Sequence, residues 1–391
     1  MTKITGENIK AESSINTEKW DGEELAKVRI RLLKGHTHSV NNCQFIQDSH
    51  TIFSSSSDCS VKLWNSKTGE CVRSYDDLHN SNISQACCLS DGSKFLSCGW
   101  DKKFKYTDTE TGQCLIEKNH DDFLTCCQIS HDRKLIAVGS DLAKSLRIYD
   151  IESGELIHEL KDFHKSSLTS LRFAPGDDKV MTTSMDRTAK FFDLVSGINT
   201  ITLEGHTNIV SSCAITYDER KFATGSWDKT ILIWDVATGM YRSKGPTVLK
   251  GSHEGSVSCC QFSNDGLLLV TGSYDMSIVV WDIENSAQKL KLQGHMGWVN
   301  DVCFSADQKW LLSCSKDKTI RLWNLEESDQ IPMVLENKKA VGVKVVKCSK
   351  CAKPFSLSQL ESFQDITVCV FCRLASPEKS WLSYNEMVEN S

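Results

Sequence analysis

Histidine, serine or threonine, and aspartate recur together along this chain of 391 residues at a fixed spacing. Near the middle of the chain, Thr224 stands four positions before Asp228, and His206 stands 22 positions before it. A base, a hydroxyl nucleophile and a carboxylate are the groups with which many hydrolases cleave acyl bonds. That chemistry needs one set with an exposed hydroxyl and an oxyanion hole. The number of copies therefore distinguishes a catalytic role from a structural one.

The set belongs to a repeat that occurs seven times with a period near 42 residues. In six of the seven copies, an aspartate stands 22 residues after the first histidine. In the third copy the interval is 21 and the turn is irregular, so the equivalence of Asp141 is open. Apolar residues stand four and nine positions after each histidine, which predicts a buried strand in every copy. The seven histidines are His36, His79, His120, His164, His206, His253 and His295.

The repeat resembles the WD-repeat (WD40) family over about residues 28–326. The Gly-His pair of that family occurs at Gly35-His36, Gly205-His206 and Gly294-His295, and several copies end in Trp-Asp or Trp-Asn, as at Trp234-Asp235. The resemblance implies an all-β fold, a seven-bladed β-propeller with four strands per blade. We expect an N-terminal strand at residues 28–33 to complete the last blade and so close the ring.

The resemblance also implies that the His, Ser/Thr and Asp sets are structural tetrads completed by Trp. In such a buried network the aspartate accepts from the histidine, the histidine bridges to the hydroxyl, and the hydroxyl reaches the Trp N–H. Unit four has Phe192 in place of Trp, unit two lacks the Trp, and unit three lacks a clear Asp and the hydroxyl, so blades two and three should be the least rigid. The complete tetrads are His36, Ser54, Asp58 and Trp64; His206, Thr224, Asp228 and Trp234; His253, Thr271, Asp275 and Trp281; and His295, Ser313, Asp317 and Trp323.

Two positions of each unit should line the narrow face of the propeller around its axis. The residue before the turn aspartate is Ser57, Trp100, Ser140, Met185, Trp227, Tyr274 or Lys316, and the residue three after the histidine is Ser39, Asn82, Phe123, Ser167, Ile209, Ser256 or Trp298. Turns normally carry small polar residues. Apolar side chains here either pack on neighbouring turns or form an exposed patch that binds a partner. The candidate partner-binding residues are Trp100, Phe123, Met185, Ile209, Trp227, Tyr274 and Trp298.

Four of the 18 cysteines form two Cys-x2-Cys pairs near the C-terminus. Two such pairs separated by 17 residues favour one tetrahedral Zn²⁺ over a redox dithiol. No histidine follows His295, so the site would have four cysteine ligands and no open coordination position, which makes the zinc structural. We predict a zinc-ribbon-like module in which the strands KVVKC and ITVCVFC form a hairpin. The expected ligands are Cys348, Cys351, Cys369 and Cys372.

The composition indicates which class of partner and which cellular compartment to expect. The formal net charge of −6 disfavours a broad nucleic-acid surface. We find no signal-peptide pattern and no run of 18 apolar residues, and therefore expect no membrane span. Many cysteines occupy apolar strand positions as small hydrophobes, so we expect free thiols and an intracellular protein, cytoplasmic, nuclear or both. The sequence does not indicate an oligomeric state.

The expected organisation is a polar tail (1–26), the propeller (27–326), a linker (327–343), the zinc module (344–374) and a second tail (375–391). We find no Walker loop, no His-Glu-x-x-His and no Gly-x-Ser-x-Gly motif, and predict that the protein is not an enzyme. The predicted function is that of an interaction scaffold or adaptor that binds a protein or peptide on its narrow face. The alternatives are a substrate-recognition subunit of an enzyme complex and a propeller enzyme.

Overall fold

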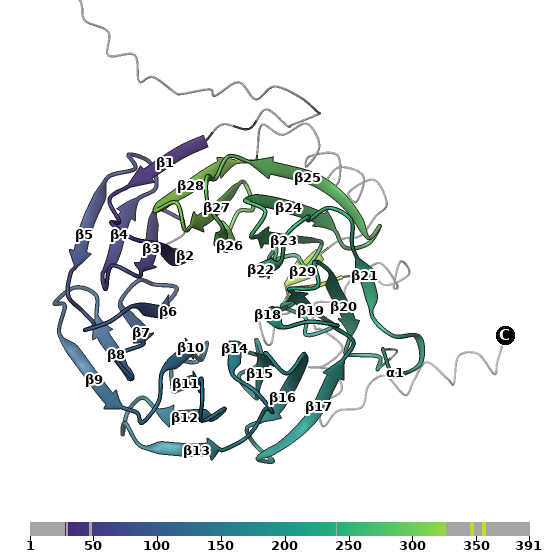
Figure 1. The fold of residues 1–391 in the computed structure, drawn as a ribbon, viewed down its shortest axis with the longest axis horizontal. Helices are drawn as coiled ribbons and strands as arrows, with labels where there is room; N and C mark the ends of the chain where they lie inside the picture. Colours follow the sequence, from purple (N-terminus) through teal and green to yellow (C-terminus); the bar gives the residue numbers. More distant parts are fainter. Residues whose placement is uncertain are drawn as a thin grey trace, which may run out of the picture.

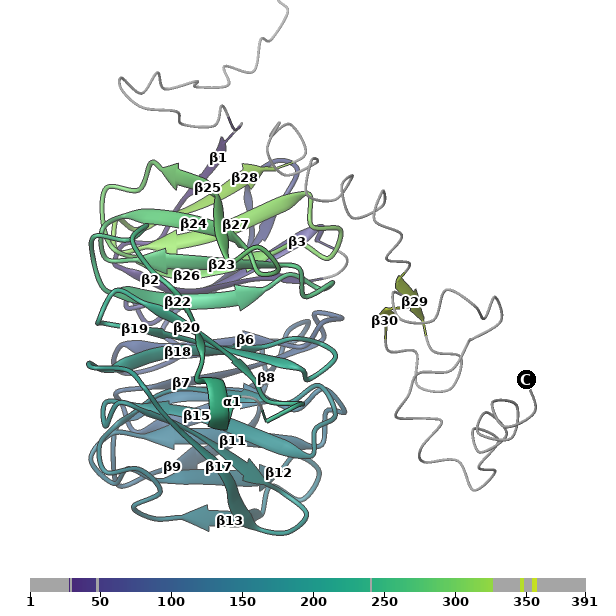
Figure 2. The ribbon, with the colours of Figure 1, turned by 90° about the vertical axis from the view of Figure 1, so that its right-hand side faces the viewer.

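Seven antiparallel sheets of four strands follow one another around a common axis as the blades of one ring (Figure 1). The computed structural model describes residues 28, 30–46, 49–239, 241–325, 345–347 and 354–356. Viewed from the side, the strands run between the two faces of a disc (Figure 2). The all-β, seven-bladed propeller predicted from the repeat is confirmed.

Within each blade the strands follow one another from the axis outward. Blade 1 contains β2 (Val40–Ile46), β3 (Thr51–Ser56), β4 (Val61–Asn65) and β5 (Cys71–Tyr75). Blade 2 contains β6 (Ile83–Cys88), β7 (Lys94–Gly99), β8 (Lys103–Asp108) and β9 (Cys114–Asn119). Blade 3 contains β10 (Leu124–Ile129), β11 (Leu135–Ser140), β12 (Leu146–Asp150) and β13 (Leu156–Leu160). Blade 4 contains β14 (Leu168–Phe173), β15 (Lys179–Ser184), β16 (Thr188–Asp193) and β17 (Ile198–Glu204).

The remaining blades keep this order, and blade 7 takes its outer strand from the start of the chain. Blade 5 contains β18 (Val210–Ile215), β19 (Lys221–Ser226), β20 (Ile231–Asp235) and β21 (Thr247–Leu249), with the short helix α1 (Tyr241–Lys244) before β21 on the outer edge of the ring. Blade 6 contains β22 (Val257–Phe262), β23 (Leu268–Ser273), β24 (Ser277–Asp282) and β25 (Ala287–Gln293). Blade 7 contains β26 (Val299–Phe304), β27 (Trp310–Ser315), β28 (Thr319–Asn324) and β1 (Ile30–Lys34).

The second strand of every blade is buried at each position after its first residue. Both faces of such a strand are covered because every sheet packs against the sheets on either side. The core between blades 1 and 2 shows this, since Phe53 and Leu63 of blade 1 pack in one cluster with Ile83 and Phe95 of blade 2. No blade buries both of its faces alone, so stability depends on closing the ring.

The predicted closure by the N-terminal strand is confirmed. β1 pairs antiparallel with β28, from Ile30 opposite Trp323 to Lys34 opposite Thr319. Leu33 of β1 is 1% exposed and lies in one core cluster with residues of blades 1 and 7. The inner strands β26 and β2 are also in contact, so the junction is closed at the axis as well as at the circumference.

A series of side-chain hydrogen bonds, which we did not predict from the sequence, joins neighbouring inner strands. The residue five after the histidine donates to the backbone carbonyl of the next blade at 2.5–2.8 Å in six of the seven junctions. The carbonyls of an edge strand need such partners because no further strand pairs with them. The donors are Asn41, Ser84, Thr169, Ser211, Ser258 and Asn300.

The junction between blades 7 and 1 also contains a carboxylate. Asp301 Oδ2 accepts from Asn42 Nδ2 at 2.5 Å and from the Cys43 backbone N–H at 3.2 Å. Burial raises the pKa of Asp301 to about 6, although Arg172 and the hydrogen bonds from the Cys43 and Val302 N–H groups oppose that shift. At neutral pH the closing junction therefore holds an ionised carboxylate in surroundings that favour the protonated form.

We expect removal of β1 to destabilise the propeller far more than removal of the preceding tail. Deleting residues 1–34 removes all five residue pairs between β1 and β28, together with the buried Leu33. Burial of a leucine side chain alone stabilises the fold by about 2 kcal/mol. Deleting residues 1–24 leaves β1 in place. Thermal unfolding of the two truncated proteins measures the difference. Equal melting temperatures would show that the N-terminal strand does not close the ring.

Asp301→Asn should stabilise the protein at pH 7.5 and not at pH 4. The pKa of Asp301 is higher in the folded protein than in the unfolded chain. Ionisation of this carboxyl therefore lowers the free energy of unfolding, which is highest at low pH and falls as the pH rises toward about 6. The variant escapes that loss, which we expect to be about 1–3 kcal/mol. Denaturant unfolding at both pH values tests this. Asp76→Asn is the matched control, since its exposed carboxyl has a lowered pKa, chiefly through its hydrogen bond from Ser74. A variant less stable than wild type at pH 7.5 would contradict the prediction.

Candidate functional site

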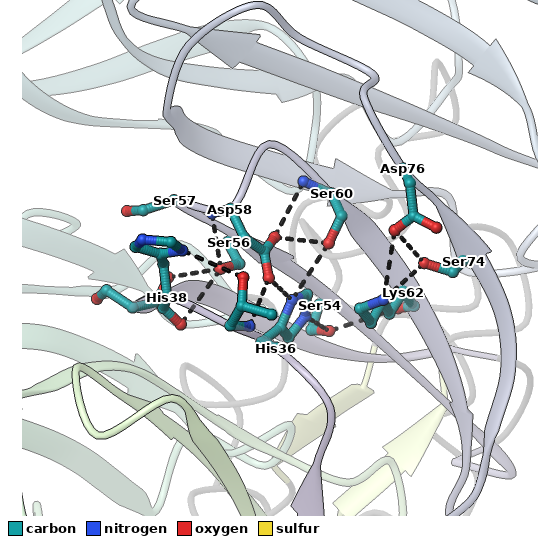
Figure 3. A network of polar contacts seen from close by, with 12 residues as sticks. His36, His38, Ser54, Ser56, Ser57, Asp58, Ser60, Lys62, Ser74 and Asp76 are labelled. Atoms are coloured by element: carbon teal, nitrogen blue, oxygen red, sulfur yellow. Dashed lines mark hydrogen bonds and ion pairs between the residues drawn. The ribbon is translucent and has the colours of Figure 1, made fainter.

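The first candidate site is the His, Ser/Thr and Asp set, and the structure joins these residues by hydrogen bonds. In blade 1, His36 Nδ1 lies 2.9 Å from Asp58 Oδ2, and His36 Nε2 lies 2.8 Å from Ser54 Oγ (Figure 3). Trp64 Nε1 donates to the same Ser54 oxygen at 2.8 Å. The Asp accepts from Nδ1–H, so Nε2 is the nitrogen that accepts from the hydroxyl. Every polar atom of the network thus has a partner.

The same contacts recur in blades 5, 6 and 7. His206, His253 and His295 each lie 2.7–2.8 Å from a hydroxyl through Nε2, and a Trp N–H donates to that hydroxyl at 2.8–3.0 Å. Blades 2 and 4 keep the His, hydroxyl and Asp contacts without a Trp, with Thr107 and Phe192 in its place. Six of the seven units therefore contain the His, hydroxyl and Asp contacts.

Burial argues against a catalytic role for these hydroxyls. All six are at most 1% exposed: Ser54, Ser97, Thr182, Thr224, Thr271 and Ser313. Burial lowers the pKa of His164, His206 and His295, although each aspartate partner opposes that shift. The turn aspartates have lowered pKa values despite their burial, because the histidine and neighbouring N–H and O–H groups donate to them. Burial thus favours the neutral imidazole of His164, His206 and His295, and none of the six hydroxyls is an accessible nucleophile.

Blade 3 satisfies its histidine by other means. Arg147 Nη1 donates to His120 Nδ1 at 2.6 Å, and Tyr149 Oη lies 3.3 Å from His120 Nε2. Burial and the Arg147 charge lower the pKa of His120 to about 4. Asp141 is not a tetrad residue. Its N–H donates to the carbonyl of Phe123, which is the contact that the residue before the turn aspartate makes in the other blades.

The two rim positions meet within each blade. In blade 5 the Trp227 N–H donates to the Ile209 carbonyl at 2.9 Å, and in blade 6 the Tyr274 N–H donates to the Ser256 carbonyl at 2.9 Å. The same contact in blade 3 corrects one assignment made from spacing. Ser140, 2% exposed, does not line the rim; Asp141 lies there instead, since it stands 21 residues after His120, the interval at which the rim residue follows the histidine in the other blades.

Three aromatic side chains from blades 5, 6 and 7 form what we call the rim cluster: Trp227, Tyr274 and Trp298, together with Lys316. The ring centres of Trp227 and Tyr274 are 6.0 Å apart, and those of Tyr274 and Trp298 are 4.6 Å apart in a stacked arrangement. Lys316 Nζ lies 4.0 Å from the centre of the Trp298 ring. Trp298 is 43% exposed, and the other two rings are half-buried. The cluster extends over three blades.

A second aromatic pair lies on blades 2 and 3. The rings of Trp100 and Phe123 are 6.3 Å apart, and Lys102 Nζ lies 5.4 Å from the Phe123 ring centre. Both rings are exposed, as is Met185 of blade 4, whereas Ile209 is half-buried. The seven predicted rim residues therefore form two aromatic groups, with Met185 and Ile209 on the blades between them.

Two further exposed methionines belong to the same turns and loops as the rim cluster, and the spacing of the repeat did not predict them as candidate site residues. Met276 follows the turn residue Asp275 and is 42% exposed, and Met296 follows His295 and is 80% exposed. Both positions carry polar or charged residues in most other units, which is the signal that could have identified them.

The four candidate zinc ligands Cys348, Cys351, Cys369 and Cys372 lie outside the described residues. Two short strands flank the first pair. β29 (Val345–Lys347) pairs antiparallel with β30 (Pro354–Ser356), and Cys348 and Cys351 fall between these two strands in the sequence. A Cys-x2-Cys pair between paired strands suits half of a tetrahedral thiolate site. The predicted hairpin between KVVKC and ITVCVFC involves residues beyond the described part of the chain.

No helix within the described residues is long and apolar enough to cross a membrane.

A hollow of about 650 Å³ lies between blades 1 and 2, and its lining includes Arg73, Asp91 and Asp108. Arg73 donates to the Thr109 carbonyl, Asp91 pairs with Arg133, and Asp108 accepts from Thr111. These three polar side chains of the lining are thus already engaged in hydrogen bonds and ion pairs of the blades.

Comparisons with known proteins agree with this architecture. The family model described as "WD domain, G-beta repeat" matches residues 27–65, 69–108, 112–150, 154–193, 197–235, 246–282 and 286–324. WD repeat-containing protein 88 of Homo sapiens is 38% identical over 357 residues, which cover 90% of this chain and 76% of that protein.

Other relatives match about half of this chain. Pre-mRNA-processing factor 17 of Homo sapiens is 27% identical over 58% of this chain and 40% of its own length. Guanine nucleotide-binding protein subunit beta-5b of Danio rerio is 27% identical over 51% of each chain. With seven repeats matched and a relative that is similar along most of both chains, this chain belongs to the WD40-repeat family.

Proposed function

We propose that this WD40-repeat protein is a non-enzymatic scaffold or adaptor that binds a peptide or protein on its narrow face. The observation that supports this most is the rim cluster. Its aromatic rings extend over three blades and take no part in the tetrads. Exposed aromatic groups of this kind are typical of binding sites, and Trp and Tyr contribute much of the binding free energy at protein interfaces.

The alternatives use different parts of the molecule. A substrate-recognition subunit of an enzyme complex would use the same rim, so it differs from a scaffold only in what it binds to. A propeller enzyme would need an accessible nucleophile or base, whereas the tetrad hydroxyls are buried and the imidazoles are held by hydrogen bonds. The rim therefore favours binding over catalysis.

We also propose a structural zinc ion held by Cys348, Cys351, Cys369 and Cys372. The hairpin of β29 and β30 around the first cysteine pair supports this proposal. The ion would supply folding free energy to a segment too short to bury a core of its own. An intracellular location is part of the proposal, since every cysteine that the structure describes is a free thiol, as expected in a reducing compartment.

Truncating the rim cluster should abolish partner binding without unfolding the propeller. The variant Trp227→Ala, Tyr274→Ala, Trp298→Ala removes three aromatic anchors, each of which typically contributes more than about 1 kcal/mol to binding at an interface. Val72→Ala, Leu115→Ala, Ile198→Ala is the matched control, because it removes three exposed apolar side chains from outer strands. Affinity purification with mass spectrometry compares the two variants with wild type. If the rim variant keeps every wild-type partner, the rim is not the binding site.

Removing the zinc ion should unfold the C-terminal module and leave the propeller intact. We expect one zinc per chain by metal analysis, lost in Cys348→Ser, Cys351→Ser and retained in Cys71→Ser, Cys114→Ser, whose cysteines lie on exposed outer strands. Chelation should leave the propeller melting temperature within a few degrees, because its core is formed between blades. A purified chain without bound metal under reducing conditions would contradict the proposal.

A further inference from the structure

The narrow face has a charge pattern that the rim residues do not explain. The residue after the turn aspartate in six blades, and Lys144 in the longer turn of blade 3, have a positive φ between 48° and 71°, a conformation in which Asn and Asp are enriched. Five of the seven residues at this position are instead cationic. Backbone conformation gives no reason for a long cationic side chain here. The seven residues are Cys59, Lys102, Lys144, Arg187, Lys229, Met276 and Lys318.

Three of these cations are free for an external partner. Arg187, Lys229 and Lys318 are exposed and pair with no carboxylate of the described residues. Lys144 lies 4.0 Å from Asp162, and Lys102 donates to the Asp121 carbonyl. Each free cation stands two positions after a rim residue on the same turn: Met185, Trp227 or Lys316. Cations therefore accompany the apolar rim along blades 4, 5 and 7.

The turn aspartates lie on the same face, but their charge is compensated inside the protein. Asp228 accepts from His206 Nδ1, from the Thr207 and Thr230 N–H groups, and from the Thr230 hydroxyl. Its side chain is 10% exposed. The exposed carboxylates at the position after the histidine are Asp121 and Glu254. At these two positions, the exposed charged residues of blades 4, 5 and 7 are therefore all cationic.

The opposite face shows the reverse pattern. The last residue of the third strand is Asp in five of the seven blades: Asp108, Asp150, Asp193, Asp235 and Asp282. The antiparallel order of the strands places this position at the end of the blade away from the turn aspartates. Together with the net charge of −6, these aspartates show that the cations of the narrow face are not part of a generally basic surface.

From this arrangement we infer that the segment bound by the narrow face is acidic, with Asp or Glu side chains beside aromatic or aliphatic anchors. The inference rests on the proposed function and specifies the chemistry of its partner. Apolar anchors bind in the rim cluster, and carboxylates meet Arg187, Lys229 and Lys318. Complementary charge of this kind steers association and excludes basic competitors.

A nucleic acid would also be attracted to cations beside aromatic rings, but the geometry favours a peptide. Single-stranded nucleic acids bind such surfaces by stacking bases on free ring faces. Trp298 is stacked on Tyr274 at 4.6 Å, and the Lys316 ammonium lies 4.0 Å from the Trp298 ring centre. Tyr274 and Lys316 thus already occupy part of the ring surface of Trp298, on which a base would have to stack.

Peptide selection tests the inference without a known partner. A phage-displayed library of random dodecapeptides is selected on the full chain, and the enriched sequences are measured by fluorescence anisotropy. We expect enriched peptides with more Asp and Glu than Lys and Arg, together with aromatic or aliphatic residues. Arg187→Glu, Lys229→Glu, Lys318→Glu should weaken their binding by about tenfold, since each exposed charge pair contributes modestly. The control Lys67→Glu, Lys134→Glu, Arg220→Glu, on turns of the opposite face, should leave binding unchanged.

The outcomes separate this inference from the proposed function. If binding of the selected peptides requires Trp227, Tyr274 and Trp298 but the peptides contain no excess of Asp and Glu, the inference is overturned and the proposed function stands. Equal effects of the two charge-reversal variants would do the same. Binding that persists in the rim triple variant, or a selection that yields no peptide, would count against the proposed function and the inference together. Displacement of the peptide by a short polyuridylate would overturn the inference in favour of a nucleic-acid site.

Discussion

The hydrogen-bonded tetrad is the interaction on which the rest of the structure depends. Each tetrad joins the loop before an inner strand, the turn between the second and third strands, and the third strand itself, as His36, Asp58 and Trp64 do in blade 1. Buried polar groups are costly unless they are paired, so each buried member of the network keeps a hydrogen-bond partner. It thereby fixes the two segments that form the narrow face, and the rim residues project from positions that the tetrads hold.

The exception in blade 3 shows that the requirement is satisfaction of the buried histidine rather than a particular partner. Arg147 and Tyr149 supply the contacts that the turn aspartate and the hydroxyl supply elsewhere. The turn, no longer held by an aspartate, contains one more residue, and Asp141 moves to the rim, where Ser167 of the next blade donates to it. A change in the buried network thus changes the binding face directly. The basic character of that face adds a second variable, since it depends on residues that the tetrads do not need.

Much of the fold could be predicted from the sequence because the repeat is in phase at each apolar position, and the N-terminal strand follows from the count of strands. The hydrogen bonds between inner strands were missed because Asn41 or Ser84 in an alternating strand resembles any polar residue beside an apolar one. The buried Asp301 gave no signal for the same reason. Spacing placed Trp227, Tyr274 and Trp298 on one face, whereas their mutual stacking depends on the angle between blades, which the sequence does not encode locally. Ser140 was misplaced because Asp141 was equated with the turn aspartate, although its interval of 21 residues from His120 is that of the rim position. The four C-terminal cysteines stay a prediction from spacing, supported by the flanking hairpin.

The central claim is that the tetrads hold the blades rigid so that the rim can vary, and hydrogen–deuterium exchange measured blade by blade tests it most directly. The account predicts faster exchange of the central strands of blades 2 and 3, two of the three blades without a complete tetrad, than of the corresponding strands of blades 5, 6 and 7. The amides to compare are those of β7, β8, β11 and β12 against those of β19, β20, β23, β24, β27 and β28. Equal protection in all of these strands would contradict the account, because the blades would then be held by packing alone.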